Sequence, residues 1–187
     1  FHFEIAADIL NEEELELLEQ MRPGLVQLEI GVQSTNPKTI KEIHRVMDFE
    51  KVSRIVRRIQ DKGNVHEHLD LIAGLPGEDA ADMQDTLEKI EKLHPDSLTV
   101  HSLAIKRASR LNQWIQENGV SMLHNTDETM KIAAAGAEKL GMKPYYLYRQ
   151  KNMSGNFENT GYARPGKYGL YNILIMEEKQ TIVALGA

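Results

Sequence analysis

The stretch His68-Leu69-Asp70-Leu71-Ile72-Ala73-Gly74-Leu75-Pro76-Gly77-Glu78-Asp79 decides the fold class of this chain. Its first half is a short apolar run interrupted by one carboxylate, and the Gly-Leu-Pro-Gly sequence ends that run in a turn. A helix is predicted directly afterwards, over residues 80–93, because Met83, Leu87 and Ile90 recur at helical spacing. A strand, a glycine turn and an amphipathic helix in that order indicate one unit of a parallel β/α architecture.

The same alternation of strands and helices continues on both sides of this unit. Upstream, strands are predicted over 3–6 and 26–32, and a helix over 49–62 ends at a glycine. Downstream, a fourth strand is predicted over 97–103. Beyond residue 106 the pattern changes, and the predicted elements are helices over 110–118 and 126–140, a strand over 144–150, a long polar loop over 151–169, and a terminal hairpin with strands over 171–176 and 181–185. A loop of that length is commonly functional.

The composition is that of a globular domain without cysteine. The net charge of -6 argues against broad binding to nucleic acid or to anionic membranes. No apolar stretch approaches the roughly 20 residues that span a bilayer, and no secretory signal is present. The lack of cysteine excludes a disulfide framework and a thiolate metal site within this sequence. We therefore expect a cytoplasmic enzyme that acts on a small molecule.

Both ends of the sequence read as strands. It opens with Phe1-His2-Phe3-Glu4-Ile5 and closes with Thr181-Ile182-Val183-Ala184-Leu185. Natural domains usually begin and end in exposed, mobile segments. We therefore expect a piece cut from a longer protein, with a processed natural terminus as the alternative.

Polar residues at the carboxyl ends of the predicted strands nominate a functional site, because active sites of parallel β/α barrels lie there. These residues are Glu4, Gln33, Ser34, Asp70, His101 and Ser102. Asp70 is the most informative, because an unpaired carboxylate inside an apolar strand is costly. A pair of ribose hydroxyls would satisfy it, and so would a donor from the neighbouring backbone or an arginine.

No metal site is predicted. His66, His68 and Asp70 alternate and therefore share one face of a strand. One strand edge closes poorly around a tetrahedral ion, so we expect these residues to line or brace the interior instead. The remaining histidines that we expect at the surface or at helix ends are His2, His44, His94 and His124.

Basic residues gather around the predicted loop of an otherwise acidic chain. These are Arg149, Lys151, Arg164 and Lys167. An acidic small molecule could dock there. The alternative is a solvated loop whose neighbouring tyrosines pack on the rest of the domain.

Three strand-end motifs together resemble those of the radical S-adenosylmethionine (radical SAM) enzymes. They are Gly31-Val32-Gln33-Ser34, the stretch 70–78 and Ser97-Leu98-Thr99-Val100. The resemblance points in particular to oxygen-independent coproporphyrinogen III oxidase, and the stretches 106–112 and 144–163 resemble its variant called coproporphyrinogen dehydrogenase. The first 80 or so residues also resemble radical enzymes that carry a cobalamin-binding domain.

The resemblance implies an α/β fold made of the later strands of a partial (β/α)6 barrel, similar to a TIM barrel and truncated at its amino terminus. Residues 1–106 would form the C-terminal two thirds of that barrel, and residues 107–187 a C-terminal α+β extension. The implied cofactors are S-adenosyl-L-methionine and a four-iron four-sulfur cluster held by a Cys-x-x-x-Cys-x-x-Cys loop. Because this sequence has no cysteine, the resemblance implies that the cluster ligands and the catalytic centre lie outside it, and that the chain is inactive alone.

The family's cofactor contacts are carried over position by position. Glu4 would face the aminoacyl part of S-adenosyl-L-methionine, and Arg45 would pair with its carboxylate. Gln33 and Asp70 would hold the ribose hydroxyls. The adenine would be bordered by backbone at three further residues, Ile72, Ala73 and Ala104.

The resemblance implies an oxidoreductase of tetrapyrrole synthesis as the parent enzyme. Propionate side chains of a porphyrinogen would lose carbon dioxide and become vinyl groups, with an external electron donor as partner. Arg149, Lys151 and Arg164 are the predicted cationic contacts for those propionates. The alternatives are a cobalamin-dependent radical enzyme of unknown substrate and a cysteine-free barrel that serves only as a binding or scaffold module.

Overall fold

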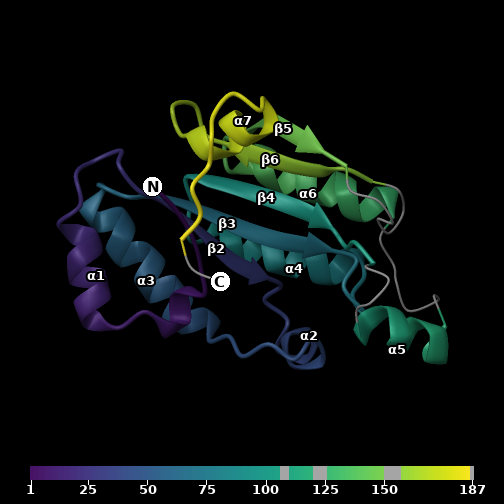
Figure 1. Ribbon diagram of the computed structural model, residues 1–187. Coiled ribbons are helices and arrows are strands. Elements are labelled where there is room, and N and C mark those ends of the chain that lie inside the picture. Colours follow the sequence, from purple (N-terminus) through teal and green to yellow (C-terminus); the bar gives the residue numbers. More distant parts are fainter. Residues whose placement is uncertain (106–109, 120–125, 150–156, 186–187) are drawn as a thin grey trace.

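The computed structural model describes residues 1–105, 110–119, 126–149 and 157–185. Six strands of these residues form one sheet in the order β1-β2-β3-β4-β6-β5 (Figure 1). The strands are β1 (His2–Ile5), β2 (Gln27–Gln33), β3 (His66–Ala73), β4 (Ser97–Ser102), β5 (Lys143–Tyr148) and β6 (Asn159–Ala163). β1 to β4 run parallel, as the alternation of elements predicted, whereas β6 is antiparallel to both β4 and β5.

The directions of the strands give the sheet two distinct edges. β1 to β4 all end at one edge, which we call the carboxyl edge, and they begin at the opposite one, the amino edge. β5 also ends at the carboxyl edge, because it is antiparallel to a strand that is itself antiparallel to β4. β6 therefore ends at the amino edge. This geometry decides which of the predicted site residues can meet.

The helices that contribute to the buried core cover one face of the sheet, whereas the helix over Leu170–Met176 contacts the other face. The helices are α1 (Glu12–Glu19), α2 (Pro37–Glu42), α3 (Phe49–Lys62), α4 (Ala80–Glu91), α5 (Arg110–Asn118), α6 (Asp127–Lys139) and α7 (Leu170–Met176), with a 3-10 turn η1 at Ala7–Ile9. Side-chain caps begin several of them: Asn11 and Glu14 form a capping box on α1, and Asp79 and Asp82 form another on α4. No helix in the described ranges has both the length and the apolar character needed to cross a membrane.

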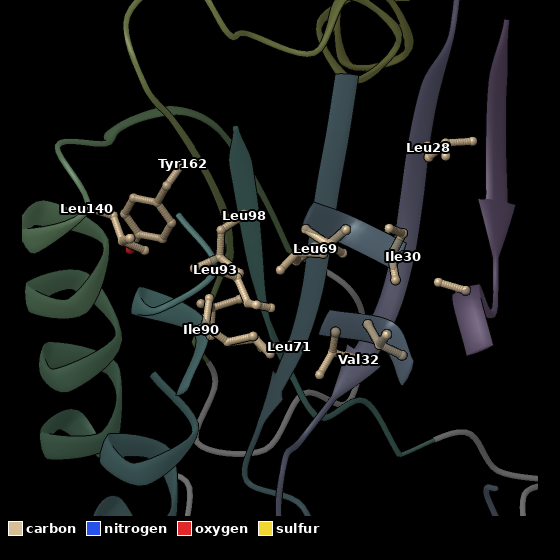
Figure 2. Close-up of a cluster of buried hydrophobic side chains, with 14 of the residues drawn as sticks. Leu28, Ile30, Val32, Leu69, Leu71, Ile90, Leu93, Leu98, Leu140 and Tyr162 are labelled. Carbon is tan, nitrogen blue, oxygen red and sulfur yellow. The ribbon is translucent and has the colours of Figure 1, made fainter. Parts of the chain in front are cut away.

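Alternation along the strands separates an apolar face from a polar face. One face of the sheet carries a buried apolar cluster (Figure 2). It contains Leu28, Ile30 and Val32 of β2 and Leu69 and Leu71 of β3. The apolar stripes of α3 and α4 complete that cluster, with Val56 and Ile90 fully buried. The intervening strand residues point the other way and form what we call the polar face, which consists of His2, Glu4, Glu29, Gly31, His68, Asp70, Ser97, Thr99 and His101.

The last third of the chain differs from its prediction in three places. The segment expected to be a loop over 151–169 contains β6, whose Gly161 allows a close approach of the Tyr146 ring, since a Cβ there would lie 2.0 Å from Cε1 of that ring. The hairpin over 171–176 and 181–185 was wrong, because 170–176 forms helix α7 and 181–185 has no regular structure. A short apolar run does not by itself distinguish strand from helix. The sequence of β6 has no recognisable strand pattern. Its strand conformation depends on its pairing with β4 and β5.

Replacing Leu69 by alanine tests the apolar face. Leu69 has no exposed surface, so the substitution is expected to lower the free energy of unfolding by about 2–5 kcal/mol, measured by urea denaturation. Leu147→Ala is the matched control, because Leu147 of β5 is 59% exposed and its loss should change stability by less than about 0.5 kcal/mol. Equal losses in the two variants would contradict the burial of Leu69 in the core.

Candidate functional site

A pocket of about 1050 Å³ opens at the carboxyl edge of the sheet. Its walls come from the ends of β2, β3 and β4, from the segment after α2, and from α5. The lining residues are Gln33, Glu42, Ile43, His44, Arg45, Ile72, Leu75, Pro76, Leu103 and Leu111. Three residues predicted as cofactor contacts, Gln33, Arg45 and Ile72, therefore lie in one pocket. We call it the carboxyl-edge pocket.

Gly31 shapes the polar side of this pocket. The Arg45 guanidinium donates a hydrogen bond from Nη2 to the Gly31 carbonyl oxygen at 2.9 Å. A Cβ atom on Gly31 would lie 2.6 Å from Nε2 of Gln33 and 3.2 Å from Nη2 of Arg45. Only a residue without a side chain therefore lets the amide and the guanidinium approach the strand this closely. Gln33 itself adopts a left-handed conformation, φ 68°, where the strand ends.

A buried hydrogen bond joins the two turns that follow β2 and β3. The Ser34 hydroxyl donates to Oε1 of Glu78 at 2.5 Å. Thr35 adds a second connection, because its hydroxyl lies 3.1 Å from that of Thr86 in α4. These contacts hold the end of β2 against the Gly-Leu-Pro-Gly turn, and so they fix the width of the pocket between Gln33 and Ile72.

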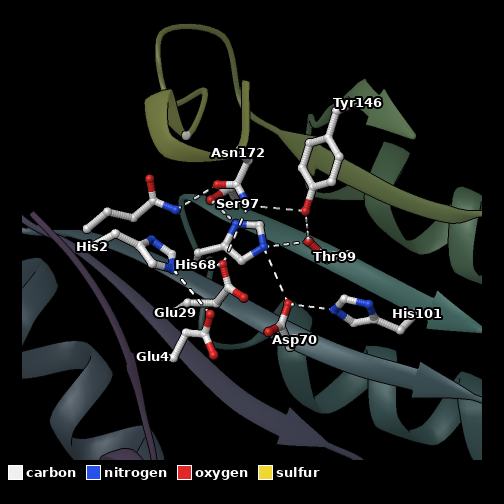
Figure 3. A network of polar contacts seen from close by, with 12 residues as sticks. His2, Glu4, Glu29, His68, Asp70, Ser97, Thr99, His101, Tyr146 and Asn172 are labelled. Carbon is white, nitrogen blue, oxygen red and sulfur yellow. Dashed lines mark hydrogen bonds and ion pairs between the residues drawn. The ribbon is translucent and has the colours of Figure 1, made fainter. Parts of the chain in front are cut away.

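Asp70 lies on the polar face beside Gly31, its partner in the register of β2 and β3. Its carboxylate is 3.1 Å from Nε2 of His101 and 3.5 Å from Nε2 of His68 (Figure 3). Burial opposes ionisation, but the hydrogen bonds and charges of His101 and His68 outweigh it and hold the pKa of Asp70 below its ordinary range. The donors to this aspartate are thus histidines, which the sequence analysis did not consider.

The network around Asp70 continues across the sheet. The buried His68 ring contacts the hydroxyls of Ser97 at 2.7 Å and Thr99 at 2.6 Å. Thr99 contacts the Tyr146 hydroxyl at 2.6 Å. Tyr146 in turn accepts a hydrogen bond from the Asn172 amide at 3.3 Å, so α7 closes the network from above the sheet (Figure 3). The sequence analysis placed Tyr146 among the tyrosines beside the predicted loop and missed Asn172, because the partners of these residues lie far away in the chain.

Glu4 lies apart from the carboxyl-edge pocket. Its carboxylate is 4.0 Å from Nε2 of His2, and Glu29 is 3.5 Å from the same nitrogen. His2 was expected at the surface, and this was wrong: its side chain is 9% exposed, and its ring stacks on Tyr171 with centroids 3.8 Å apart. Burial lowers the pKa of His2 to about 4. Burial, followed by the charge of Asp70, raises the pKa of Glu29 to about 8.

The two remaining predicted contacts to adenine lie next to the pocket. Ala73 is fully buried on the apolar side, and its carbonyl oxygen accepts a hydrogen bond from the Leu103 amide at 3.0 Å. That bond joins the ends of β3 and β4 at the pocket wall. Ala104 follows directly and is half-buried.

The predicted substrate cations are not brought together. Arg149 follows β5 at the carboxyl edge and pairs with Glu158 at 3.1 Å. Arg164 follows β6 at the amino edge, where it pairs with Asp96 at 2.8 Å. Lys151 lies outside the described residues.

Asp96 and Glu67 form a buried acidic pair at the amino edge. Lys167 adds a second cation 3.1 Å from Asp96. Glu67 is 1% exposed and accepts hydrogen bonds from the Gln60 side chain at 2.8 Å and from the Asp96 amide at 3.0 Å. Burial, with the charge of Asp96, raises the pKa of Glu67 to about 7.

Comparisons with known proteins show which proteins this chain resembles. The family model of the Radical SAM superfamily matches residues 1–90. The oxygen-independent coproporphyrinogen-III oxidase-like protein HemZ of Bacillus subtilis is 39% identical over 179 residues, which cover 96% of this chain and 35% of HemZ. These matches make the chain similar to radical SAM proteins of the coproporphyrinogen III oxidase-like kind.

Two further proteins that are similar to this chain are described as coproporphyrinogen III oxidases. Oxygen-independent coproporphyrinogen III oxidase of Salmonella typhimurium is 32% identical over 110 residues, which cover 56% of this chain and 24% of that enzyme. The structure of HemN, the radical SAM coproporphyrinogen III oxidase of Escherichia coli, superposes with a TM-score of 0.69 at 20% identity and covers 94% of this chain and 37% of HemN. The chain thus spans about a third of the length of HemZ and HemN.

The pH dependence of the stability of the Glu67→Gln variant tests the acidic pair Asp96 and Glu67 at the amino edge. A carboxyl group whose folded pKa lies above its unfolded value of 4.5 stabilises the fold below that value and loses this contribution as the pH rises through about 7. Glutamine does not titrate, so the free energy of unfolding of Glu67→Gln relative to wild type should rise by up to ~3 kcal/mol between pH 4.5 and pH 7. Urea denaturation across that range measures the difference.

The control for this prediction is Glu16→Gln, an exposed position on α1. Its stability relative to wild type should stay constant over the same pH range. A constant difference for Glu67→Gln as well would mean that Glu67 ionises in the folded protein as it does in the unfolded chain.

Proposed function

We propose that this chain supplies the cofactor-binding part of a radical SAM oxidoreductase of the coproporphyrinogen III oxidase-like kind. The observation that carries the proposal is the carboxyl-edge pocket, where Gln33, Arg45 and Ile72 converge beside the strand that holds Asp70. The similarity to HemZ over 96% of the chain supports the same assignment.

The charges and apolar walls at the pocket support S-adenosyl-L-methionine as its ligand. The Arg45 guanidinium suits the carboxylate of the aminoacyl group, because the two groups form strong charge-assisted hydrogen bonds. Asp70 stays ionised, so it can accept hydrogen bonds from ribose hydroxyls, with the Gln33 amide beside them. Apolar walls at Ile72 and Leu103 suit an adenine. The absence of a side chain at Gly31 lets the Gln33 amide and the Arg45 guanidinium lie close to β2, where they line the pocket.

The remaining cofactor contacts implied by the family resemblance are proposed for the same bound position of S-adenosyl-L-methionine. Ala73 and Ala104 would border the adenine through backbone, at the place where β3 and β4 are joined. Glu4 would face the aminoacyl group from β1. It lies beside His2 and Glu29 on β1, the strand next to the β2 strand whose Gly31 carbonyl binds Arg45.

We propose that the chain binds this cofactor but does not catalyse a reaction alone. Bound at a reduced four-iron four-sulfur cluster, S-adenosyl-L-methionine supplies one-electron chemistry that removes a hydrogen atom from a substrate. A cluster held by cysteines needs thiolates that these 187 residues do not contain, and it needs an external electron donor. Within this chain, the residues of the pocket bind and orient the cofactor.

The proposed substrate is a porphyrinogen with propionate side chains, acted on in the cytoplasm. Arg149 lies at the carboxyl edge and is the candidate that this geometry favours. Arg164 is engaged by Asp96 at the other edge, so its role as a propionate contact would require a substrate that reaches both edges. Because the match to HemZ runs through both halves of the chain, it favours this reading over the cobalamin-dependent alternative.

Binding of S-adenosylhomocysteine to the 187-residue chain, measured by isothermal titration calorimetry, tests the proposal. Arg45→Ala and Asp70→Asn are each expected to weaken binding by about 10-fold or more, because a hydrogen bond to a charged group contributes about 1.5–3 kcal/mol. Arg57→Ala is the matched control, since Arg57 is an exposed arginine on α3. It should bind as wild type does.

Two results would contradict the proposal. One is a folded wild-type chain that does not bind S-adenosylhomocysteine. The other is binding that Arg45→Ala and Asp70→Asn leave unchanged, which would place the ligand away from the carboxyl-edge pocket and favour the scaffold alternative.

A further inference from the structure

We propose that His101 and Tyr148 position the Asp70 carboxylate for the ribose hydroxyls, so that strand β5 contributes to cofactor binding from outside the carboxyl-edge pocket. Asp70 is the cofactor contact, and the two other residues act through it as positioning residues. This inference rests on the function proposed for the pocket, because it assigns the same ligand to Asp70. The strand-end rule nominated His101 without assigning it a role, and Tyr148 was one of the tyrosines beside the predicted loop.

Asp70 needs a hydrogen-bond donor because its carboxylate is largely buried. Its side chain is 13% exposed, and Glu29 on the adjacent strand is a second carboxylate that interacts with it unfavourably. Nε2 of His101 lies 3.1 Å from Oδ1 of Asp70 (Figure 3). Nε2 of His68 lies 3.5 Å from the same oxygen, but it is closer to the Thr99 hydroxyl, at 2.6 Å. His101 is therefore the principal donor to Asp70.

The tautomer of His101 decides whether its ring can donate to Asp70. A neutral imidazole carries one proton, so one ring nitrogen donates a hydrogen bond and the other accepts one. The Tyr148 hydroxyl lies 3.3 Å from Nδ1 of His101. When this hydroxyl donates to Nδ1, the ring proton lies on Nε2, which faces the carboxylate. Tyr148 thus selects the tautomer that makes His101 a donor to Asp70.

The position of Tyr148 belongs to a regular arrangement of β5 against β4. Strand β6 lies between them, so Tyr148 reaches across β6 to His101. Tyr146, two residues earlier, reaches Thr99 in the same way, and the two tyrosine rings stack with centroids 6.3 Å apart. The lack of a side chain at Gly161 opens this path, because a Cβ there would lie 2.0 Å from the Tyr146 ring. Two tyrosines of β5 therefore contact two residues of β4 with the same spacing.

An Asp70 carboxylate held in this way remains able to bind a ribose. A carboxylate offers about four acceptor sites, so it can accept from the His101 ring and from ribose hydroxyls at the same time. Fixing one oxygen also fixes the plane of the carboxyl group. The ribose then binds an acceptor that is already oriented, which reduces the entropy lost on binding.

Binding of S-adenosylhomocysteine, measured by isothermal titration calorimetry, tests both positioning roles. His101→Phe is expected to weaken binding roughly 10-fold, because a hydrogen bond to a charged group is lost. His101→Gln should restore much of the affinity, since its amide can donate to Asp70. Tyr148→Phe should weaken binding roughly 3-fold, as expected for the loss of a neutral hydrogen bond. Tyr145→Phe is the matched control, because this hydroxyl on the same strand accepts a hydrogen bond from the Gly169 amide, and it should bind as wild type does.

A double-mutant cycle separates positioning from a general loss of structure. Asp70→Asn removes the charge through which His101 is proposed to act. Adding His101→Phe to Asp70→Asn should therefore change the affinity by less than about 2-fold. Losses of affinity that add fully would mean that His101 affects the pocket without Asp70, and they would overturn the proposal.

The tautomer of His101 in the unliganded wild-type chain tests the geometry without a ligand. Side-chain ¹⁵N resonances at about pH 9, above the ordinary titration range of imidazole, should show the ring proton on Nε2. Tyr148→Phe should move the Nδ1 resonance, because that nitrogen loses its donor. A ring proton on Nδ1 in wild type, or an Nδ1 resonance that Tyr148→Phe leaves unchanged, would overturn the proposal.

The two levels of the account fail in different ways. A folded wild-type chain that does not bind S-adenosylhomocysteine overturns the proposed function and this assignment with it. Wild-type binding that His101→Phe and Tyr148→Phe leave unchanged overturns only the positioning roles.

Discussion

The two-residue alternation of side chains along β2, β3 and β4 is the constraint on which the rest of the structure depends. In parallel strands this alternation places every second residue on the same face of the sheet. Leu69 and Leu71 thus enter the apolar face that α3 and α4 bury, while His68 and Asp70, which alternate with them, are directed to the polar face. A shift of one residue in register would bury the carboxylate and expose the leucines.

The polar side chains that this alternation places on one face must form hydrogen bonds with one another. Asp70 is held by two histidines, His68 by two hydroxyls, and Tyr146 and Asn172 complete the network from β5 and α7. These hydrogen bonds explain why the last third of the chain packs on this face. At the carboxyl edge the same alternation sets Asp70 beside Gly31, and the missing side chain of Gly31 makes room for Gln33 and Arg45. The pocket and the network are thus two consequences of one pattern.

Much of the parallel sheet and part of the site were predictable from local sequence. The strands around Leu28, Leu69 and Leu98 and the helices α3 and α4 follow from periodicity, and the rule that sites lie at strand ends nominated Gln33 and Asp70. Arg45 came only from the family resemblance, because it lies in the turn after α2, where no periodic signal exists. The burial of His2, the helical form of α7 and strand β6 depend on contacts over long distances in the chain. The bond between Gln27 and Asn172 joins residues 145 positions apart, and no local pattern contains such information.

Hydrogen–deuterium exchange of the 187-residue chain with and without S-adenosylhomocysteine tests most directly whether the carboxyl edge is the ligand-binding edge. Binding in the carboxyl-edge pocket predicts slower exchange of backbone amides in residues 31–45 and 70–76, and unchanged exchange at the amino edge around Asp96 and Lys167. Protection confined to the amino edge, or protection absent from both segments under saturating ligand, would contradict the central claim.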